Sequence, residues 1–228
     1  SAASDVYKRQ IQHRVVRADK MKVIFNGIDM NAVDKEVMLG TVTRASLKIP
    51  KNAYLIGMVG RISQQKAPDI FIQVAAFLKD ILPNTYFMIV GDGDQRNDIE
   101  QLIKDYKLEE RVIITGWVNN PVAYASLFDQ AMLLSRWEGF GLVLVEYMKL
   151  GKPIIATEVD AISDLITDHE NGILVEVNDV EQAVNAVMEI MNNAELRNKL
   201  IFNGMMRANA FFDVHRVAHE HEALFSRI

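Results

Sequence analysis

Short apolar segments alternate with amphipathic segments along most of the chain. Apolar runs bounded by glycine, proline or polar residues are typical of buried strands. They predict strands at 21–25, 53–59, 86–90, 112–115, 130–134, 153–157 and 172–175. Apolar residues at helical spacing predict helices at 69–80, 95–106, 121–127, 141–150, 180–192, 195–210 and 214–225.

This order of elements predicts an α/β fold, in which a doubly wound parallel sheet carries helices on both faces. The segment at 86–90 is apolar throughout, as expected of a strand buried on both sides. Ligands of such sheets bind beyond the carboxyl ends of the strands. The loops at 60–66, 91–93, 116–117 and 135–141 follow predicted strands, so we expect the site to lie among them.

Composition narrows the classes of function. The chain has 228 residues, half of them hydrophobic, and a net charge of -5, whereas a nucleic-acid-binding protein typically carries a basic stripe. It has no cysteine, which excludes disulfides and thiolate metal sites. No apolar run approaches the ~18 residues that a membrane span needs. We therefore expect a cytoplasmic α/β protein with no nucleic-acid partner.

The first residues lead into no periodic pattern. Residues 5–10 resemble the translation of a transposon adapter end used in sequencing libraries. We therefore interpret residues 1–10 as a leader foreign to the natural protein, with an ordinary frayed terminus as the alternative. Residues 11–228 are expected to form one domain that includes the terminal helices.

Two cations, Arg61 and Lys66, occupy the loop after the strand at 53–59. Arginine offers a planar fork to phosphate oxygens, and lysine offers a compact point charge. Two fixed cations near a strand end therefore suit a diphosphate. Taken alone, the same residues favour the alternative of a solvated basic loop.

A glycine-rich turn, Glu138-Gly139-Phe140-Gly141, precedes the helix at 141–150, which carries Glu146. Glycine allows a ligand to approach the backbone closely, and the start of a helix presents free amides to an anion. Glu146 has apolar neighbours, and a buried carboxylate needs a partner such as a pair of ribose hydroxyls. A surface glutamate on an ordinary amphipathic helix is the alternative.

Taken together, the motifs resemble a known family. They are Asn26–Asp29, Val59–Lys66, Val90–Gly93, Ser135–Glu146 with its Glu-x7-Glu spacing, Gly151–Thr157 and Asn171–Val175. From about residue 20 onwards, their order resembles the C-terminal, donor-binding domain of family-four retaining glycosyltransferases. That resemblance implies the Rossmann-like C-terminal half of a GT-B fold.

The resemblance also implies roles for the site residues. Arg61 and Lys66 would bind the donor diphosphate and stabilise the leaving nucleotide, with no metal and no cofactor. Glu138 would contact the donor sugar near the reacting centre, and Glu146 would hold the ribose. The remaining donor-binding residues would act largely through their backbones or against the base: Gly60, Gly116, Trp117, Val118, Gly139, Phe140, Gly141 and Leu142.

The implied reaction is transfer of a hexose-type sugar, with retention, from a UDP- or GDP-sugar to an acceptor hydroxyl. The family's acceptor site lies largely on an N-terminal domain absent from this sequence, so we expect this chain alone to be inactive. The full enzyme would be cytoplasmic and could associate with the inner face of the membrane. The alternatives are a nucleotide-sugar-binding module without catalysis and another GT-B enzyme, such as a sugar-nucleotide epimerase.

Two further expectations concern helices. Tyr147 and Lys149 replace the small residues that the family often has after the second glutamate, and we expect them to face solvent or a partner. The last helix, 214–225, resembles the GT-B element that crosses back onto the N-terminal domain. A helix packed entirely on its own domain is the alternative.

Overall fold

A computed structural model describes residues 24–159 and 161–226. Its centre is a six-stranded sheet with the order β3-β2-β1-β4-β5-β6 and parallel pairing throughout. The strands are β1 (Tyr54–Val59), β2 (Thr85–Val90), β3 (Val112–Ile114), β4 (Gln130–Leu133), β5 (Ile154–Thr157) and β6 (Ile173–Val175). Because β1 lies between β2 and β4, the order reverses there, and ligands of doubly wound sheets bind at such a switch point.

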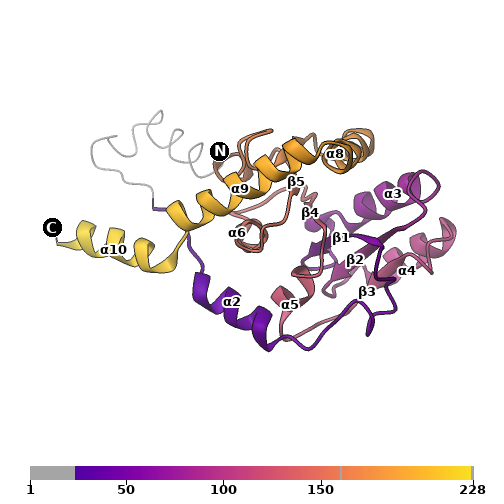
Figure 1. Ribbon diagram of the computed structural model, residues 1–228, viewed down its shortest axis with the longest axis horizontal. Coiled ribbons are helices and arrows are strands. Elements are labelled where there is room, and N and C mark those ends of the chain that lie inside the picture. Colours follow the sequence, from indigo (N-terminus) through magenta and orange to yellow (C-terminus); the bar gives the residue numbers. More distant parts are fainter. Residues whose placement is uncertain (1–23, 160, 227–228) are drawn as a thin grey trace.

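Helices cover both faces of this sheet (Figure 1). They are α2 (Met30–Leu39), α3 (Pro68–Leu78), α4 (Arg96–Asp105), α5 (Pro121–Ala125), α6 (Leu142–Lys149), α7 (Ile162–Leu165), α8 (Val180–Asn192), α9 (Ala194–Phe211) and α10 (Val214–Phe225), with a 3-10 turn, η2, at Gln64–Lys66. One apolar cluster packs α3 and α8 against the sheet, and a second packs α6 and the end of α9 against it. The predicted doubly wound α/β fold is therefore confirmed.

The predicted strands from residue 53 onwards and all the predicted helices are present, with ends that differ by a few residues. Two helices were not predicted, α2 and the short α7. The local signal for α2 was weak because it buries only Met30 and Val33, although Asp29 caps its first amides. Of the strand predicted at 21–25, only residues 24–25 are described, and the prediction is wrong for them because they are not in a strand. Residues 21–23 and the interpreted leader at 1–10 lie outside the described residues.

The last helix, α10, projects from the end of α9 (Figure 1) and buries none of its residues. Its start is nevertheless fixed to the chain before α2. Ile28 donates its N–H to the carbonyl of Phe212 at 2.9 Å, and Val214 donates to the carbonyl of Ile28 at 3.0 Å. Within residues 24–159 and 161–226, every helix is too short or too polar to span a lipid bilayer.

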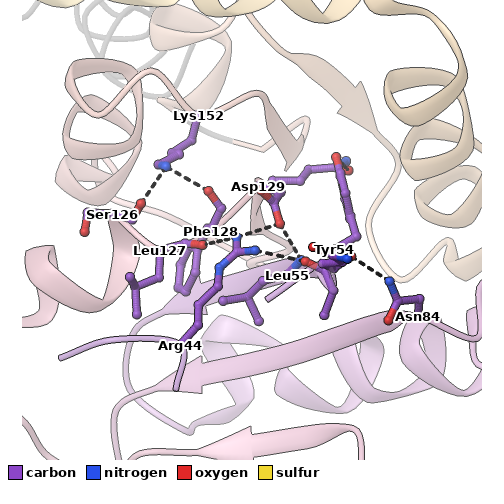
Figure 2. A network of polar contacts seen from close by, with 12 residues as sticks. Arg44, Tyr54, Leu55, Asn84, Ser126, Leu127, Phe128, Asp129 and Lys152 are labelled. Atoms are coloured by element: carbon purple, nitrogen blue, oxygen red, sulfur yellow. Dashed lines mark hydrogen bonds and ion pairs between the residues drawn. The ribbon is translucent and has the colours of Figure 1, made fainter. Parts of the chain in front are cut away.

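A polar network braces the amino edge of the sheet, opposite the switch-point loops (Figure 2). Arg44 donates to Asp129 and to the carbonyl of Leu127, at 2.7 and 2.6 Å, and Asp129 accepts the N–H of Leu55 at 2.7 Å. Lys152 donates to two neighbouring carbonyls at 2.7 Å each, and burial lowers its pKa to about 8. The network fixes the amino ends of β1 and β4.

Candidate functional site

A cavity of about 660 Å³ lies at the carboxyl ends of β1, β2 and β3. It is lined by Val59, Gly60, Arg61, Val90, Asp92, Gly93, Trp117, Val118, Asn119 and Pro121. Three loops predicted to form the site therefore meet here. The Arg61 side chain is 75% exposed and Trp117 is 83% exposed, so both remain accessible to a ligand at the rim.

The floor of this cavity depends on close backbone packing between two loops. Gly60 donates its N–H to the carbonyl of Val90 at 3.0 Å. Gly91 has a φ of +147°, and a Cβ atom placed on it would lie 2.1 Å from the carbonyl oxygen of Gly60. Only glycine fits at position 91, which explains why the sequence places a glycine directly after β2.

The loops after β1 and β4 meet through a buried ion pair. The ammonium of Lys66, in η2, contacts the Oε2 atom of Glu138, and the Ser135 hydroxyl donates to the same oxygen at 3.2 Å. The Lys66 side chain is 17% exposed and that of Glu138 only 9%. The structure thus brings together two residues that the sequence singled out separately.

Arg61 and Lys66 differ in their surroundings. Arg61 lines the cavity and forms a long ion pair with Asp94, with 3.9 Å between Nε and Oδ1. Lys66 is not among the cavity-lining residues, since its ammonium lies against Glu138. The two cations were expected to act together, but Arg61 lies at the open rim of the cavity and Lys66 lies in the buried ion pair.

The glycine-rich turn leads directly into α6. Gly141 caps the helix in the left-handed conformation, with a φ of +83°, and as a glycine it makes no side-chain capping bond to the first amides. The Phe140 ring packs against Phe25 and Phe212, with ring centroids 6.2 and 6.0 Å apart. Leu142 is 43% exposed, so this end of the helix is open to a ligand at its backbone.

Glu146 lies one helical turn further along α6. Burial and the neighbouring carboxylate of Glu36 raise its pKa to about 7. Among the described residues, we find no hydrogen bond or ion pair to its carboxylate, and it does not line the cavity. The Glu146 side chain is half-buried, and the described chain supplies no hydrogen-bonding or ion-pair partner to its carboxylate.

The expectation for Tyr147 is wrong. Its side chain is fully buried, and its hydroxyl oxygen accepts the backbone N–H of Val59 at 2.7 Å. The helix α6 packs against both β5 and α9, and Tyr147 reaches the end of β1, so the buried face of α6 is wide enough to include this position. Lys149 instead forms an ion pair with Asp34 on α2, at 2.7 Å.

Sequence reasoning overlooked Arg136. Its guanidinium donates to Asp69, at the start of α3, through two nitrogens at 3.0 and 2.6 Å. It also donates to the carbonyl of Gln64 at 2.9 Å and to Asn178 at 2.8 Å. The only available signal was its position beside Glu138, because all of its partners are distant in the sequence.

Comparison with known proteins places the chain in a family. Residues 41–206 match the family described as Glycosyl transferases group 1. The chain belongs to this glycosyltransferase family. A relative from Escherichia coli, the UDP-Gal:alpha-D-GlcNAc-diphosphoundecaprenol alpha-1,3-galactosyltransferase, is 29% identical over 208 residues, which are 86% of this chain and 54% of the relative. The chain spans about half the length of the curated relatives it matches.

Solved structures assign the fold to the GT-B type. The crystal structure of Anabaena HepE with UDP-glucose superposes with a TM-score of 0.81 at 26% identity, covering 93% of this chain and 59% of that one. The C-terminal domain of LpcC, a group 1 glycosyl transferase from Francisella tularensis, superposes with a TM-score of 0.71 at 27% identity. It is covered completely by 82% of this chain. This glycosyltransferase chain therefore has the fold of a C-terminal GT-B domain, as the motifs implied.

Proposed function

We propose that this chain is the donor-binding part of a retaining, metal-independent glycosyltransferase that uses a UDP-sugar. The cavity at the carboxyl ends of β1–β3 carries the proposal, because it exposes Arg61 and Trp117 at a sheet edge suited to nucleotides. The family match and a structural relative crystallised with UDP-glucose support the same ligand class.

In this proposal the base lies against the loop at 116–119, whose Trp117 and Val118 line the cavity. The ribose hydroxyls donate to Glu146, whose carboxylate has no hydrogen bond or ion pair within the described chain. The diphosphate meets Arg61 at the rim and the backbone at Gly139–Leu142. Lys66 bridges the diphosphate and Glu138, which contacts the sugar.

The reaction breaks the bond between the anomeric carbon and a diphosphate oxygen, and it forms a bond from that carbon to the acceptor oxygen. The acceptor's proton leaves with the departing UDP. Arg61 and Lys66 stabilise the negative charge that develops on the diphosphate, a task that a metal performs in other enzymes. The chain therefore needs no metal and no further cofactor.

The acceptor and the surface that binds it are assigned to another part of the protein. The E. coli relative acts on a diphosphoundecaprenol-linked sugar, and we propose a lipid-linked acceptor of the same kind, used at the cytoplasmic face of a membrane. Closure of two domains around the substrates excludes water from the reaction. We therefore expect this chain alone to bind nucleotide without transferring sugar.

Calorimetry of this chain with UDP, GDP and ADP, each with and without Mg²⁺, tests the proposal. We expect UDP to bind most tightly, with the same affinity when EDTA replaces Mg²⁺. Preferential binding of GDP would change the donor base and leave the diphosphate site in place. Absence of nucleotide binding, or binding that requires the metal, would reject the donor-site proposal.

A further inference from the structure

We propose that Arg136 is a positioning residue that holds Lys66 in place for the donor diphosphate. This inference rests on the proposed function, because it assigns a task at the same nucleotide site. Arg136 precedes Glu138 by two residues and lies in the loop after β4, whereas Lys66 ends the turn after β1. The two loops are neighbours because β1 and β4 pair in the sheet.

All three nitrogens of the Arg136 guanidinium are engaged. Two of them form a bidentate ion pair with Asp69, which lies in the first turn of α3. One of these also donates to the carbonyl of Gln64, and Nε donates to Asn178. Because the planar fork matches a carboxylate, such a pair fixes direction as well as distance.

Backbone contacts extend the link toward Lys66. The N–H of Arg136 donates to the carbonyl of Gln65 at 2.8 Å, and the Gln65 side-chain amide donates to the carbonyl of Trp137 at 3.1 Å. Arg136 and Trp137 therefore bind the two residues that immediately precede Lys66. The Lys66–Glu138 ion pair is the next contact in this series between the two loops.

The conformation after Lys66 explains why such a link is needed. Ala67 has a φ of +49°, a left-handed conformation that an alanine adopts at a cost of about 1 kcal/mol. The turn that ends at Lys66 is a single 3-10 turn, and Ala67, the N-cap of the following helix, makes no side-chain capping bond to it. Arg136 contacts the chain on both sides of Ala67, at Gln64 and Asp69, and so holds this strained turn in place.

If Arg136 positions Lys66, its substitution should reduce nucleotide affinity most for ligands that carry a diphosphate. Lys66 is assigned to the diphosphate and not to the base, so displacing it weakens binding of UDP more than binding of UMP. General destabilisation of the fold would weaken both ligands in proportion. The ratio of UDP to UMP affinity therefore distinguishes positioning from a merely structural effect.

The test measures UDP and UMP affinities by calorimetry, and melting temperatures, for Arg136→Gln and Arg136→Lys. Arg44→Gln is the matched control, since Arg44 is 24% exposed against 20% for Arg136 and binds Asp129 at the opposite edge of the sheet (Figure 2). We expect Arg136→Gln to lose UDP affinity about tenfold and UMP affinity about twofold or less. We expect Arg136→Lys to recover part of the loss, and Arg44→Gln to lower only the melting temperature.

An Arg136→Gln variant that binds UDP as tightly as the parent overturns the positioning role. Equal losses for UDP and UMP overturn it as well. If Arg136→Gln does not fold, Asp69→Asn is measured in the same way, because it removes the bidentate ion pair and keeps the arginine. A parent chain that fails to bind any nucleotide rejects the proposed function itself, a result distinct from failure of the variants alone.

Discussion

The ammonium of Lys66 lies against the buried carboxylate of Glu138, although the two residues belong to loops that follow different strands. The contact joins β1 to β4 at the switch point of the sheet. It also means that, before a donor binds, the charge of Lys66 is balanced by Glu138. In the proposed function, a diphosphate therefore shares this lysine with the carboxylate, and the two anionic groups compete for it electrostatically.

This competition predicts opposite effects of two substitutions on UDP affinity. Lys66→Met removes a cation assigned to the diphosphate, so we expect an affinity loss of about tenfold. Glu138→Gln removes the competing charge and keeps a hydrogen-bonding side chain, so we expect UDP to bind about threefold more tightly. Calorimetry on both variants at low ionic strength measures the contrast. A loss of UDP affinity in Glu138→Gln would contradict it.

The raised pKa of Glu146 predicts a stability effect that depends on pH. Its folded pKa of about 7 exceeds the ordinary value of 4.5, so the group favours the folded state most at low pH. That contribution is lost as the pH rises through 7. Glu146→Gln, which stays uncharged, should therefore unfold at a higher urea concentration than the parent at pH 8. We expect its free energy of unfolding to be larger by on the order of 1–2 kcal/mol. Near pH 5 the difference should shrink.

Glu110, which is exposed and lies just before β3, provides the control for this comparison. Glu110→Gln should change stability little and by the same amount at pH 5 and pH 8. Equal stability of Glu146→Gln and the parent at pH 8 would show that the charged, half-buried carboxylate does not destabilise the fold. Because Glu146 is also assigned to the ribose, the same variant should bind UDP more weakly even where it is more stable.

Local pattern was sufficient for most strands and helices because apolar runs and helical spacing reflect burial within each segment. It was insufficient for α2, whose buried face consists of Met30 and Val33 alone. It also failed at Tyr147. Its burial depends on how α6 packs between the sheet and α9, and no short segment of sequence encodes that packing.

The sequence indicated individual residues of the candidate site, but it did not indicate which of their side chains contact one another. Glycines and charges after strands identified Arg61, Lys66 and Glu138, since parallel strands end at one edge. Which of these side chains would pair depended on β1 lying beside β4, an order that the chain reaches only after two intervening strands. Arg136 was missed for the same reason, because Asp69 and Asn178 approach it only in the folded sheet.

The two glycines of the turn before α6 should respond differently to alanine. Gly141 has a φ of +83°, and an added Cβ would lie 3.4 Å from Glu138 and Leu144, so Gly141→Ala should cost about 1–2 kcal/mol. A Cβ on Gly139 would meet no atom of the described residues within 4 Å, so Gly139→Ala should change stability by less than about 0.5 kcal/mol. Urea unfolding measures both.

Gly139 should also affect the affinity for a sugar-carrying donor. If the backbone at Gly139 approaches the donor sugar, the stable Gly139→Ala variant should still bind a UDP-sugar more weakly than the parent. Its affinity for UDP, which lacks the sugar, should change less. A Gly139→Ala variant with unchanged affinity for UDP-glucose and UDP-galactose would remove this glycine from the donor site.

The hydrogen bond from the Val59 N–H to the Tyr147 hydroxyl predicts that α6 influences the cavity at the carboxyl ends of β1–β3. Tyr147→Phe leaves the half-buried Val59 N–H without its acceptor, at a cost of about 1–3 kcal/mol. Val59 lines the cavity and precedes Gly60, so UDP affinity should fall together with stability. Tyr54→Phe is the control, since it removes a hydroxyl from the opposite end of β1, where Tyr54 donates to Gln130 at 3.1 Å. We expect that variant to lose stability and keep its UDP affinity. Equal UDP affinities for Tyr147→Phe and the parent would show that the end of β1 is held by its strand neighbours alone.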